Sequence, residues 1–234
     1  GTASEQDTAL LKEAGYPSLL ATVLAARGIT TAEAAAEALE RESSLTISPM
    51  LMRDMDKAVA RIQKAMANDE IIAVFGDYDV DGITSTVLLL DYLKSCGVRC
   101  LRYIPRRIED GYGLSKDAIQ GLRNQGATLM ITVDCGITNL EEVALAKKRG
   151  MTVIVTDHHQ LAEKLPEADA VLNPLIEPYA FKRLCGAGVA LKITQALLGM
   201  DGVEKRIDLA ALATVADIVP LMEENRVIVR EGMM

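Results

Sequence analysis

Residues 71–95, IIAVFGDYDVDGITSTVLLLDYLKS, decide the fold class of this chain. The stretch begins with an apolar run, Ile71–Phe75, that stops abruptly at a glycine and Asp77, which is typical of a strand buried on both faces. Residues 83–95 then carry the apolar spacing of a helix, and a glycine is placed to end it. A buried strand followed directly by a helix predicts one unit of a parallel α/β sheet.

The same alternation continues along the rest of the chain. Further strands are predicted at 98–105, 128–134, 151–157 and 168–174. Helices are predicted between or after them at 116–125, 140–149, 188–198 and 207–215. This rhythm with short turns predicts an α/β fold, with a mostly parallel sheet that has helices on both faces.

The residues before the first strand follow a different pattern. Residues 8–66 are rich in Ala, Leu and Glu and lack the alternation of strands, so we expect them to be helical. The chain is therefore predicted to have two parts. The first is an N-terminal helical segment, residues 1–66, packed on the core, and the second is the α/β domain, residues 67–234.

The composition indicates a folded chain with an aliphatic core. Of the 234 residues, 50% are hydrophobic and 25% are charged, and the mean hydropathy is +0.17, which excludes wholesale disorder. Only 3% are aromatic and none is Trp, so aliphatic side chains must fill the core. No apolar run reaches the length that spans a bilayer. The first residues lack the basic region and apolar stretch of a signal peptide.

Charge and cysteine content restrict the partners and the compartment. A net charge of −8 and a pI of about 4.9 argue against binding nucleic acid by bulk charge alone. They leave room for a local basic groove and for metal cations bound by clustered carboxylates. The four cysteines form no Cys-x-x-Cys pair, so we expect reduced thiols in a cytoplasmic protein.

Acidic residues and both histidines follow three of the predicted strands at the points where these strands end. They are Asp77, Asp79, Asp81, Asp134, Asp157, His158 and His159. Ligands of open parallel sheets bind outside the carboxyl ends of the strands, so we expect these side chains to converge on one edge. Carboxylates at that density take up protons unless a cation lies among them. Oxygen ligands with one or two imidazoles favour Mn²⁺ or Mg²⁺ over Zn²⁺, because no thiolate pair accompanies them.

The same residues also have simpler interpretations. Asp77–Gly82 also matches the opening of a calcium-binding EF-hand loop, but Leu88 stands where the bidentate Glu is needed and a strand precedes the motif. Asp134 alone would be read as a turn residue. The two histidines alone would be read as a core pair. A metal site is favoured because every histidine in the chain is predicted at the same edge as the acids.

Four successive motifs resemble those of the DHH phosphoesterase superfamily. They read GDYDVDG at 76–82, VDCG at 133–136, TDHH at 156–159 and VADIVPL at 215–221. The form with three Asp residues resembles the RecJ-like single-strand-DNA-specific exonucleases. Family II pyrophosphatases and the small phosphodiesterases of the superfamily have a His four residues before the first Asp of an Asp-x-Asp pair, where this chain has Phe75. The resemblance is firmest from Leu51 to Gly232.

The resemblance implies metal-dependent phosphodiester hydrolysis by a two-metal mechanism. It identifies residues 67–234 as the catalytic domain of a 5′→3′ single-strand-DNA exonuclease that acts in DNA repair and recombination. It assigns one ion to Asp77, Asp79 and Asp134, with Asp77 in place of the missing His. It assigns the other ion to Asp81, Asp134, His158 and Asp217. The first site lacks an imidazole and is expected to bind its ion more weakly.

The resemblance also implies roles beyond metal binding. His159 is expected to contact the scissile phosphate or stabilise the transition state, Asp157 to orient its neighbours, and Asp134 to bridge the two ions. Arginines that follow the second strand, Arg106 and above all Arg107, are expected to hold substrate phosphate, with Arg102 close by. The glycine-rich turn with Gly186 and Gly188 is expected to offer N–H groups to a phosphate, although close helix packing explains it equally well.

Some implications concern what lies outside these motifs. RecJ-like proteins continue into a DHH-associated domain and an OB-fold, which are absent from this sequence, so the chain is expected to correspond to the catalytic part. Single-stranded DNA is the expected partner, together with a helicase or a single-strand-binding protein, and a monomer is favoured. Two alternatives remain open: a phosphodiesterase for oligoribonucleotides or cyclic dinucleotides, and a non-catalytic scaffold of a replication complex.

Overall fold

The structure is a computed structural model that describes residues 4–39, 47–106 and 113–234. The chain divides into two compact units, Gly1–Ser44 and Leu45–Met234, which are described separately. None of the helices in the described part is long and apolar enough to cross a membrane.

The first unit is helical, as predicted. It contains α1 (Glu5–Glu13), α2 (Ser18–Ala26) and α3 (Ala32–Leu39). These helices share a small apolar core formed by Leu11, Ala21, Leu24, Ala25 and Ala35. The hydroxyl of Thr31 accepts the Ala34 N–H at the start of α3, which satisfies one of the free donors of that helix.

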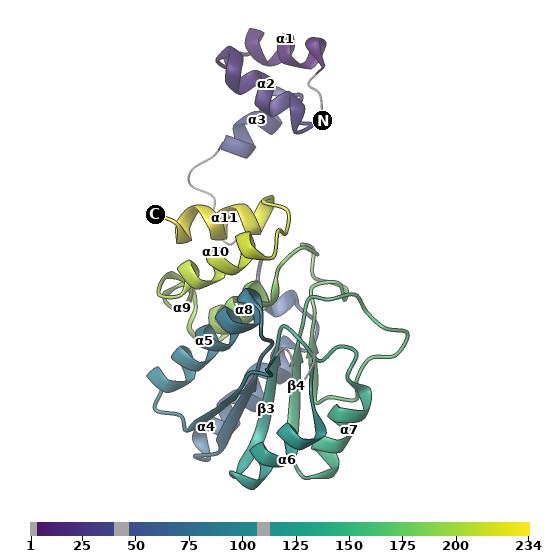
Figure 1. Cartoon of the computed structure of the whole chain (residues 1–234). Helices are drawn as coiled ribbons and strands as arrows, with labels where there is room; N and C mark the ends of the chain where they lie inside the picture. The colour runs from purple at the N-terminus through teal and green to yellow at the C-terminus, as the bar shows by residue number, and fades with distance from the viewer. Residues whose placement is uncertain (1–3, 40–46, 107–112) are drawn as a thin grey trace. The chain divides into compact units, whose positions relative to one another are not determined.

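The second unit is built on a five-stranded sheet (Figure 1). Its strands are β1 (Ile71–Phe75), β2 (Cys100–Tyr103), β3 (Ala127–Val133), β4 (Thr152–Thr156) and β5 (Ala170–Leu172). Their order is β2-β1-β3-β4-β5, and every pair of neighbours runs parallel. The predicted α/β fold with a mostly parallel sheet is confirmed.

Helices cover both faces of the sheet, because successive residues of each strand point to opposite sides. In β1, Ile72 and Val74 join one apolar core, whereas Ala73 and Phe75 join the other. The first core is closed by α4 (Met55–Ala67), α5 (Val80–Ser95), α8 (Gly186–Leu198) and α10 (Ile207–Ala216). The second is closed by α6 (Lys116–Asn124) and α7 (Leu140–Lys148) (Figure 1). The remaining elements are η1 (Pro49–Leu51), α9 (Met200–Glu204) and α11 (Glu223–Gly232).

The division between the compact units falls earlier than the predicted boundary after Met66. Helix α4 lies in the second unit, because Met55, Ala58 and Ile62 are fully buried in the same core as β1 and β3. The segment predicted to be helical, residues 8–66, is therefore divided between two separately packed units. Sequence periodicity reports where helices form, but it does not report which core they join.

Two helices near the strand ends begin earlier than predicted. Helix α5 starts at Val80 instead of Ile83, because the Asp79 carboxylate accepts the Gly82 N–H at 2.9 Å and caps the helix. Helix α8 starts at Gly186 instead of Gly188. Both shifts bring predicted site residues into the first turn of a helix.

Candidate metal centre

The candidate site lies where the strand order of the sheet reverses. From β1, the chain proceeds to β2 on one side and later to β3 on the other. A crevice outside the carboxyl ends of β1 and β3 is therefore expected at this point. The loop that follows β1 starts with Gly76, where a Cβ atom would lie 2.0 Å from Thr86 Oγ1. Only glycine lets the chain leave β1 so close to α5.

The three acids after β1 occupy different local positions. Asp77 lies in the loop, Asp79 caps α5, and Asp81 lies within its first turn. This placement rejects the EF-hand interpretation, because the acids lead from a strand into a helix and Leu88 is fully buried. The first turn of a helix also favours carboxylates, since it carries the positive end of the helix dipole.

The structure brings the predicted ligand atoms together in three overlapping groups. Within each group the candidate atoms lie within 4.8 Å of one another. The groups are Asp77, Asp79 and Asp134; Asp81, His158 and Asp217; and Asp134, His158 and His159. Two residues belong to two groups each, Asp134 and His158. These residues come from the ends of β1, β3, β4 and α10, which are far apart in the sequence.

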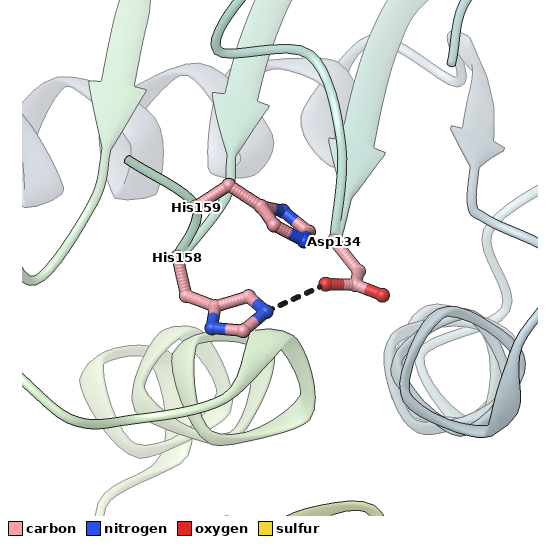
Figure 2. Close-up of side chains that lie close together, drawn as sticks. All are labelled: Asp134, His158 and His159. Carbon is pink, nitrogen blue, oxygen red and sulfur yellow. Dashed lines mark ion pairs between the residues drawn. The ribbon is translucent and has the colours of Figure 1, made fainter. Parts of the chain in front are cut away.

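His158 lies at the centre of the second group. Its Nε2 atom is 3.1 Å from Asp134 Oδ1, a contact shown in Figure 2. The same atom is 3.5 Å from Asp81 Oδ2 and 3.8 Å from Asp217 Oδ2. One imidazole nitrogen therefore faces three carboxylates, an arrangement that a cation between them would also satisfy.

Left-handed backbone accompanies two of these acids. Asp134 has φ 59°, a conformation that Asp adopts more readily than most residues. Ile218, directly after Asp217, has φ 56° and an 88% exposed side chain. A β-branched residue in this conformation is strained. The strained residue lies in the turn that places Asp217 next to His158.

Burial without sufficient counter-charge marks these carboxylates as ligands for a cation. In the described part of the chain, the buried Oδ1 of Asp77 has no hydrogen-bond partner, and the buried Oδ1 of Asp134 has none apart from its ion-pair contact with His158. Burial, together with the neighbouring Asp81 and Asp79, raises the pKa of Asp134 to about 10. Burial also raises the pKa of Asp77 and that of Asp217. Such a donor set, rich in oxygen with one or two imidazoles, fits Mn²⁺ or Mg²⁺.

Asp157 holds the histidine pair in place. Its Oδ1 accepts His159 Nδ1 at 2.7 Å and the His158 N–H at 2.8 Å, and its Oδ2 accepts the Ile137 N–H at 2.9 Å. Burial alone would raise the pKa of Asp157, but the hydrogen bonds from His159 and Ile137 leave it below its usual value. The hydrogen bond to Asp157 in turn raises the pKa of His159, against the effect of burial. Asp157 is therefore an anion that favours a proton on Nδ1 of His159.

The two histidines differ in their exposure. The side chain of His158 is 13% exposed, whereas that of His159 is 45% exposed. Figure 2 shows both rings on the side of Asp134. The more exposed ring has access to a molecule that enters from solvent, and the more buried ring faces the carboxylates. The separate roles expected for the two residues stay a prediction, since His159 also belongs to one of the three ligand groups.

The predicted substrate-phosphate residues are placed differently from one another. Arg106 follows β2 and is exposed, and Arg102 lies on β2 itself, the edge strand next to β1. Arg107 lies outside the described residues. Gly186 donates its N–H to Asp81 instead of facing outward, and Gly188 is buried against Leu184. Gly186 is therefore a backbone donor to Asp81 and Gly188 takes part in helix packing. These contacts do not leave an open site for phosphate.

Sequence reasoning missed some residues that support the site. The side chain of Asn173, fully buried after β5, donates to the His159 carbonyl at 3.0 Å. Its position directly after a strand is the same signal that identified the acids. The N–H of Ala187, which binds Asp81 at 2.8 Å, carried no such signal, because any residue type has a backbone N–H.

The chain is similar to known proteins over most of its length. The sequence profile described as DHH family, N-terminal domain, matches residues 71–217. The single-stranded-DNA-specific exonuclease RecJ of Bacillus subtilis (strain 168) is 41% identical over 218 residues, which cover 92% of this chain and 28% of that protein.

Solved structures give a consistent result. A crystal structure of exonuclease RecJ bound to manganese matches with a TM-score of 0.74 and 36% identity, covering 82% of this chain and 49% of that one. RecJ from Thermus thermophilus in complex with Mn²⁺ matches with a TM-score of 0.79 and 30% identity, covering 100% and 34%. Its complex with Mg²⁺ matches with a TM-score of 0.66 and 27% identity, covering 100% and 30%. The chain thus spans less than half the length of each of these relatives.

Proposed function

The chain belongs to the DHH family, and on that premise we propose that it hydrolyses phosphodiester bonds of single-stranded DNA with bound Mn²⁺ or Mg²⁺. The observation that carries the proposal is the set of three overlapping ligand groups that share Asp134 and His158. Two adjacent groups with a shared carboxylate are the arrangement that a pair of cations requires. The relatives described as single-stranded-DNA-specific exonucleases support DNA as the substrate.

The proposed ligands follow the groups seen at the sheet edge. Asp77, Asp79 and Asp134 form one group and would hold one cation. Asp81, His158 and Asp217 form another and would hold the second cation, joined by Asp134, whose Oδ1 lies 3.1 Å from His158 Nε2. The relatives solved with Mn²⁺ and Mg²⁺ support the choice of ion. When bound, such ions supply Lewis acidity and lower the pKa of water. The first group lacks a His in the position of Phe75, and we propose that it is the weaker site.

The remaining side chains would act on the substrate. His159, held through Nδ1 by Asp157, would donate a hydrogen bond to the phosphate as negative charge develops there. Asp157 would keep that imidazole oriented and stabilise its protonated form. Arg106 and Arg107 would bind the phosphate backbone, since guanidinium groups suit phosphate geometry. Cleavage in the 5′→3′ direction is proposed from the family resemblance alone.

We propose further that residues 1–66 supply no metal ligand. All members of the three ligand groups found among the described residues come from position 77 onward. The unpaired state of Cys96, Cys100, Cys135 and Cys185 supports a cytoplasmic place of action. Binding of a helicase or a single-strand-binding protein stays a prediction of the resemblance.

A nuclease assay with three substrates tests the proposal against its alternatives. We expect Mn²⁺-dependent release of label from 5′-labelled single-stranded DNA, with much slower cleavage of double-stranded DNA and of cyclic or linear dinucleotides. Preferred cleavage of dinucleotides would favour the small-substrate phosphodiesterase instead. Absence of hydrolysis despite Mn²⁺ binding would favour the scaffold. Chelation by EDTA and the Asp134→Asn variant serve as the matched controls.

A further inference from the structure

The first turn of α8 contacts two of the proposed metal ligands at once. We propose that this turn, Cys185–Ala187, is a positioning element that sets the carboxylates of Asp81 and Asp134 before any cation binds. The inference deepens the proposed function and rests on it, because it concerns the ligands of that same site. It assigns to the glycine-rich turn a role other than binding substrate phosphate.

The hydrogen bonds to Asp81 are the first line of support. Its Oδ2 accepts the Gly186 N–H at 2.6 Å, and its Oδ1 accepts the Ala187 N–H at 2.8 Å. The first N–H groups of a helix have no partner within the helix, and they carry its positive partial charge. Asp81 lies on α5, more than a hundred residues earlier, and is 2% exposed. Both of its oxygens are thus fixed by backbone donors, which leaves their remaining lone pairs with a defined direction.

The absence of a side chain at Gly186 is the second line of support. A Cβ atom at this position would lie 2.6 Å from the Cβ of Asp134 and 2.8 Å from its Oδ1. Real Cβ atoms do not approach so closely, so any other residue must displace Asp134 or the helix. The turn therefore orients Asp81 by hydrogen bonds and accommodates Asp134 by close contact.

The neighbouring glycine provides an internal comparison. At Gly188 the nearest atoms to a Cβ belong to Leu184, at 3.1 and 3.2 Å. Gly188 therefore faces apolar packing, while Gly186 faces a ligand, although the two glycines are only two residues apart in α8. A phosphate is not accommodated at this turn in the described structure, because the N–H groups of Gly186 and Ala187 are buried on Asp81. The two glycines can thus be tested separately.

The first experiment compares Gly186→Ala with Gly188→Ala by calorimetric titration of Mn²⁺. Displacing a group that orients a ligand typically costs about 10–100-fold in metal affinity. We expect a loss of that size for Gly186→Ala, and a change of less than about threefold for Gly188→Ala, even if the latter lowers the melting temperature. Wild-type affinity in Gly186→Ala, or equal losses in both variants, would overturn the inference and leave the turn as simple helix packing.

A second experiment covers the case in which Gly186→Ala does not fold. It measures the melting temperature of the metal-free protein for Asp81→Asn and Asp79→Asn. An Asn at position 81 can accept only one of the two N–H groups and presents a donor to the other. Its melting temperature should fall by about 2–12 °C, the effect of one buried unsatisfied donor. Asp79 caps α5, where Asn caps equally well, so that variant should stay close to the wild type.

The outcomes separate this inference from the proposed function. An unchanged or higher melting temperature for Asp81→Asn would contradict the positioning role. Failure of the wild-type protein to bind Mn²⁺ would instead contradict the proposed function, and the metal-free melting temperatures would still test the contacts of Asp81. Substrate affinity gives a further readout: if Gly186→Ala binds Mn²⁺ normally but raises KM for DNA, the turn contacts phosphate and the positioning role is wrong.

Discussion

The two ends of strand β1 carry acids in opposite electrostatic situations. Before the strand, Glu70 accepts hydrogen bonds from Arg61 at 2.6 Å and from the Thr128 hydroxyl at 2.6 Å. The hydrogen bond from Arg61 lowers the pKa of Glu70 even though burial opposes it. After the strand, burial raises the pKa of Asp77, whose Oδ1 has no hydrogen-bond partner in the described part of the chain.

This difference distinguishes Glu70, an acid that stabilises the fold, from the acids that are available to bind a cation. At the amino edge, Arg61 also donates to Thr152 at 2.8 Å, so Glu70 belongs to a network that ties α4 to β3 and β4. At the carboxyl edge, Asp81 and Asp134 are buried and Asp217 is half-buried, and the same imidazole nitrogen, His158 Nε2, faces all three. Buried charge without a partner costs folding free energy. The carboxyl edge therefore bears a cost that a bound cation would offset.

Removing the shared carboxylate should have the largest effect. We expect Asp134→Ala to lose Mn²⁺ binding and hydrolysis together, because Asp134 belongs to two of the three ligand groups. Calorimetry and the nuclease assay on the same preparation measure both properties. Retention of wild-type Mn²⁺ affinity would show that Asp134 is not a shared ligand. Glu70→Ala, at the opposite end of β1, is the matched control and should keep both properties.

Changing His159 should separate metal binding from chemistry. We expect His159→Ala to bind Mn²⁺ with nearly wild-type affinity while hydrolysis falls by about 10²–10³-fold, the usual loss for one transition-state donor. The ring is exposed to solvent by 45% and is oriented by Asp157, as a group that meets substrate requires. If Mn²⁺ binding is abolished, His159 is a ligand. If the rate is unchanged, it is only a neighbour of the site.

The metal-free protein should become more stable when Asp134 is made neutral. Its folded-state pKa of about 10 lies above the usual value of 3.8. The stability contributed by the protonated carboxyl is therefore complete below pH of about 4 and is lost as the pH rises toward 10. Asn imitates the protonated form at every pH. At pH 8 without metal, Asp134→Asn should melt higher than the wild type, by about 2–4 °C for each kcal/mol gained.

The pH dependence and the metal dependence of this effect provide the check. The difference in melting temperature should shrink as the pH is lowered toward 5, because Asp134 of the unfolded wild-type chain then approaches its usual pKa of 3.8 and folding takes up less of a proton. Addition of Mn²⁺ should raise the melting temperature of the wild type and leave that of Asp134→Asn nearly unchanged. A variant that melts lower than the wild type at pH 8 without metal would contradict the proposed cost of the buried carboxylates.

The fold and part of the site could be predicted from residue order. Asp77, Asp134 and Asp157 follow apolar runs, and the parallel arrangement of such runs brings their ends to one edge. Asp217 follows a helix, so only the family resemblance pointed to it. Asn173 had the right position after β5, but a lone Asn after a strand is common in turns.

Other features depend on packing between distant segments and could not be predicted. The backbone donors at Gly186 and Ala187 reach Asp81 only once α8 has packed beside α5. The boundary at Ser44 depends on which core α4 joins. The sequence also does not reveal that Glu70 is paired and Asp77 is not, because both are acids that flank the same strand. Arg61, which pairs with Glu70, lies nine residues away on a different element.

The smallest effect is expected at the amino edge, where Glu70→Gln removes the ion pair with Arg61 and leaves the site alone. The pair is partly exposed, so the loss of stability should be about 1 kcal/mol, or about 2–4 °C in melting temperature.

Because the pKa of Glu70 is lowered on folding, its contribution to stability is present above its usual pKa of 4.5 and is lost as the pH falls below that value. Wild type and variant should therefore converge at acidic pH because Glu70 is protonated and the ion pair is lost. The wild type approaches Asp134→Asn there for a different reason, because Asp134 becomes protonated in the unfolded chain as well as in the folded one. Mn²⁺ affinity and hydrolysis should stay at wild-type levels. A change in Mn²⁺ affinity of more than about threefold would mean that the two edges of the sheet are coupled, and the contrast between a structural acid and a ligand acid would have to be abandoned.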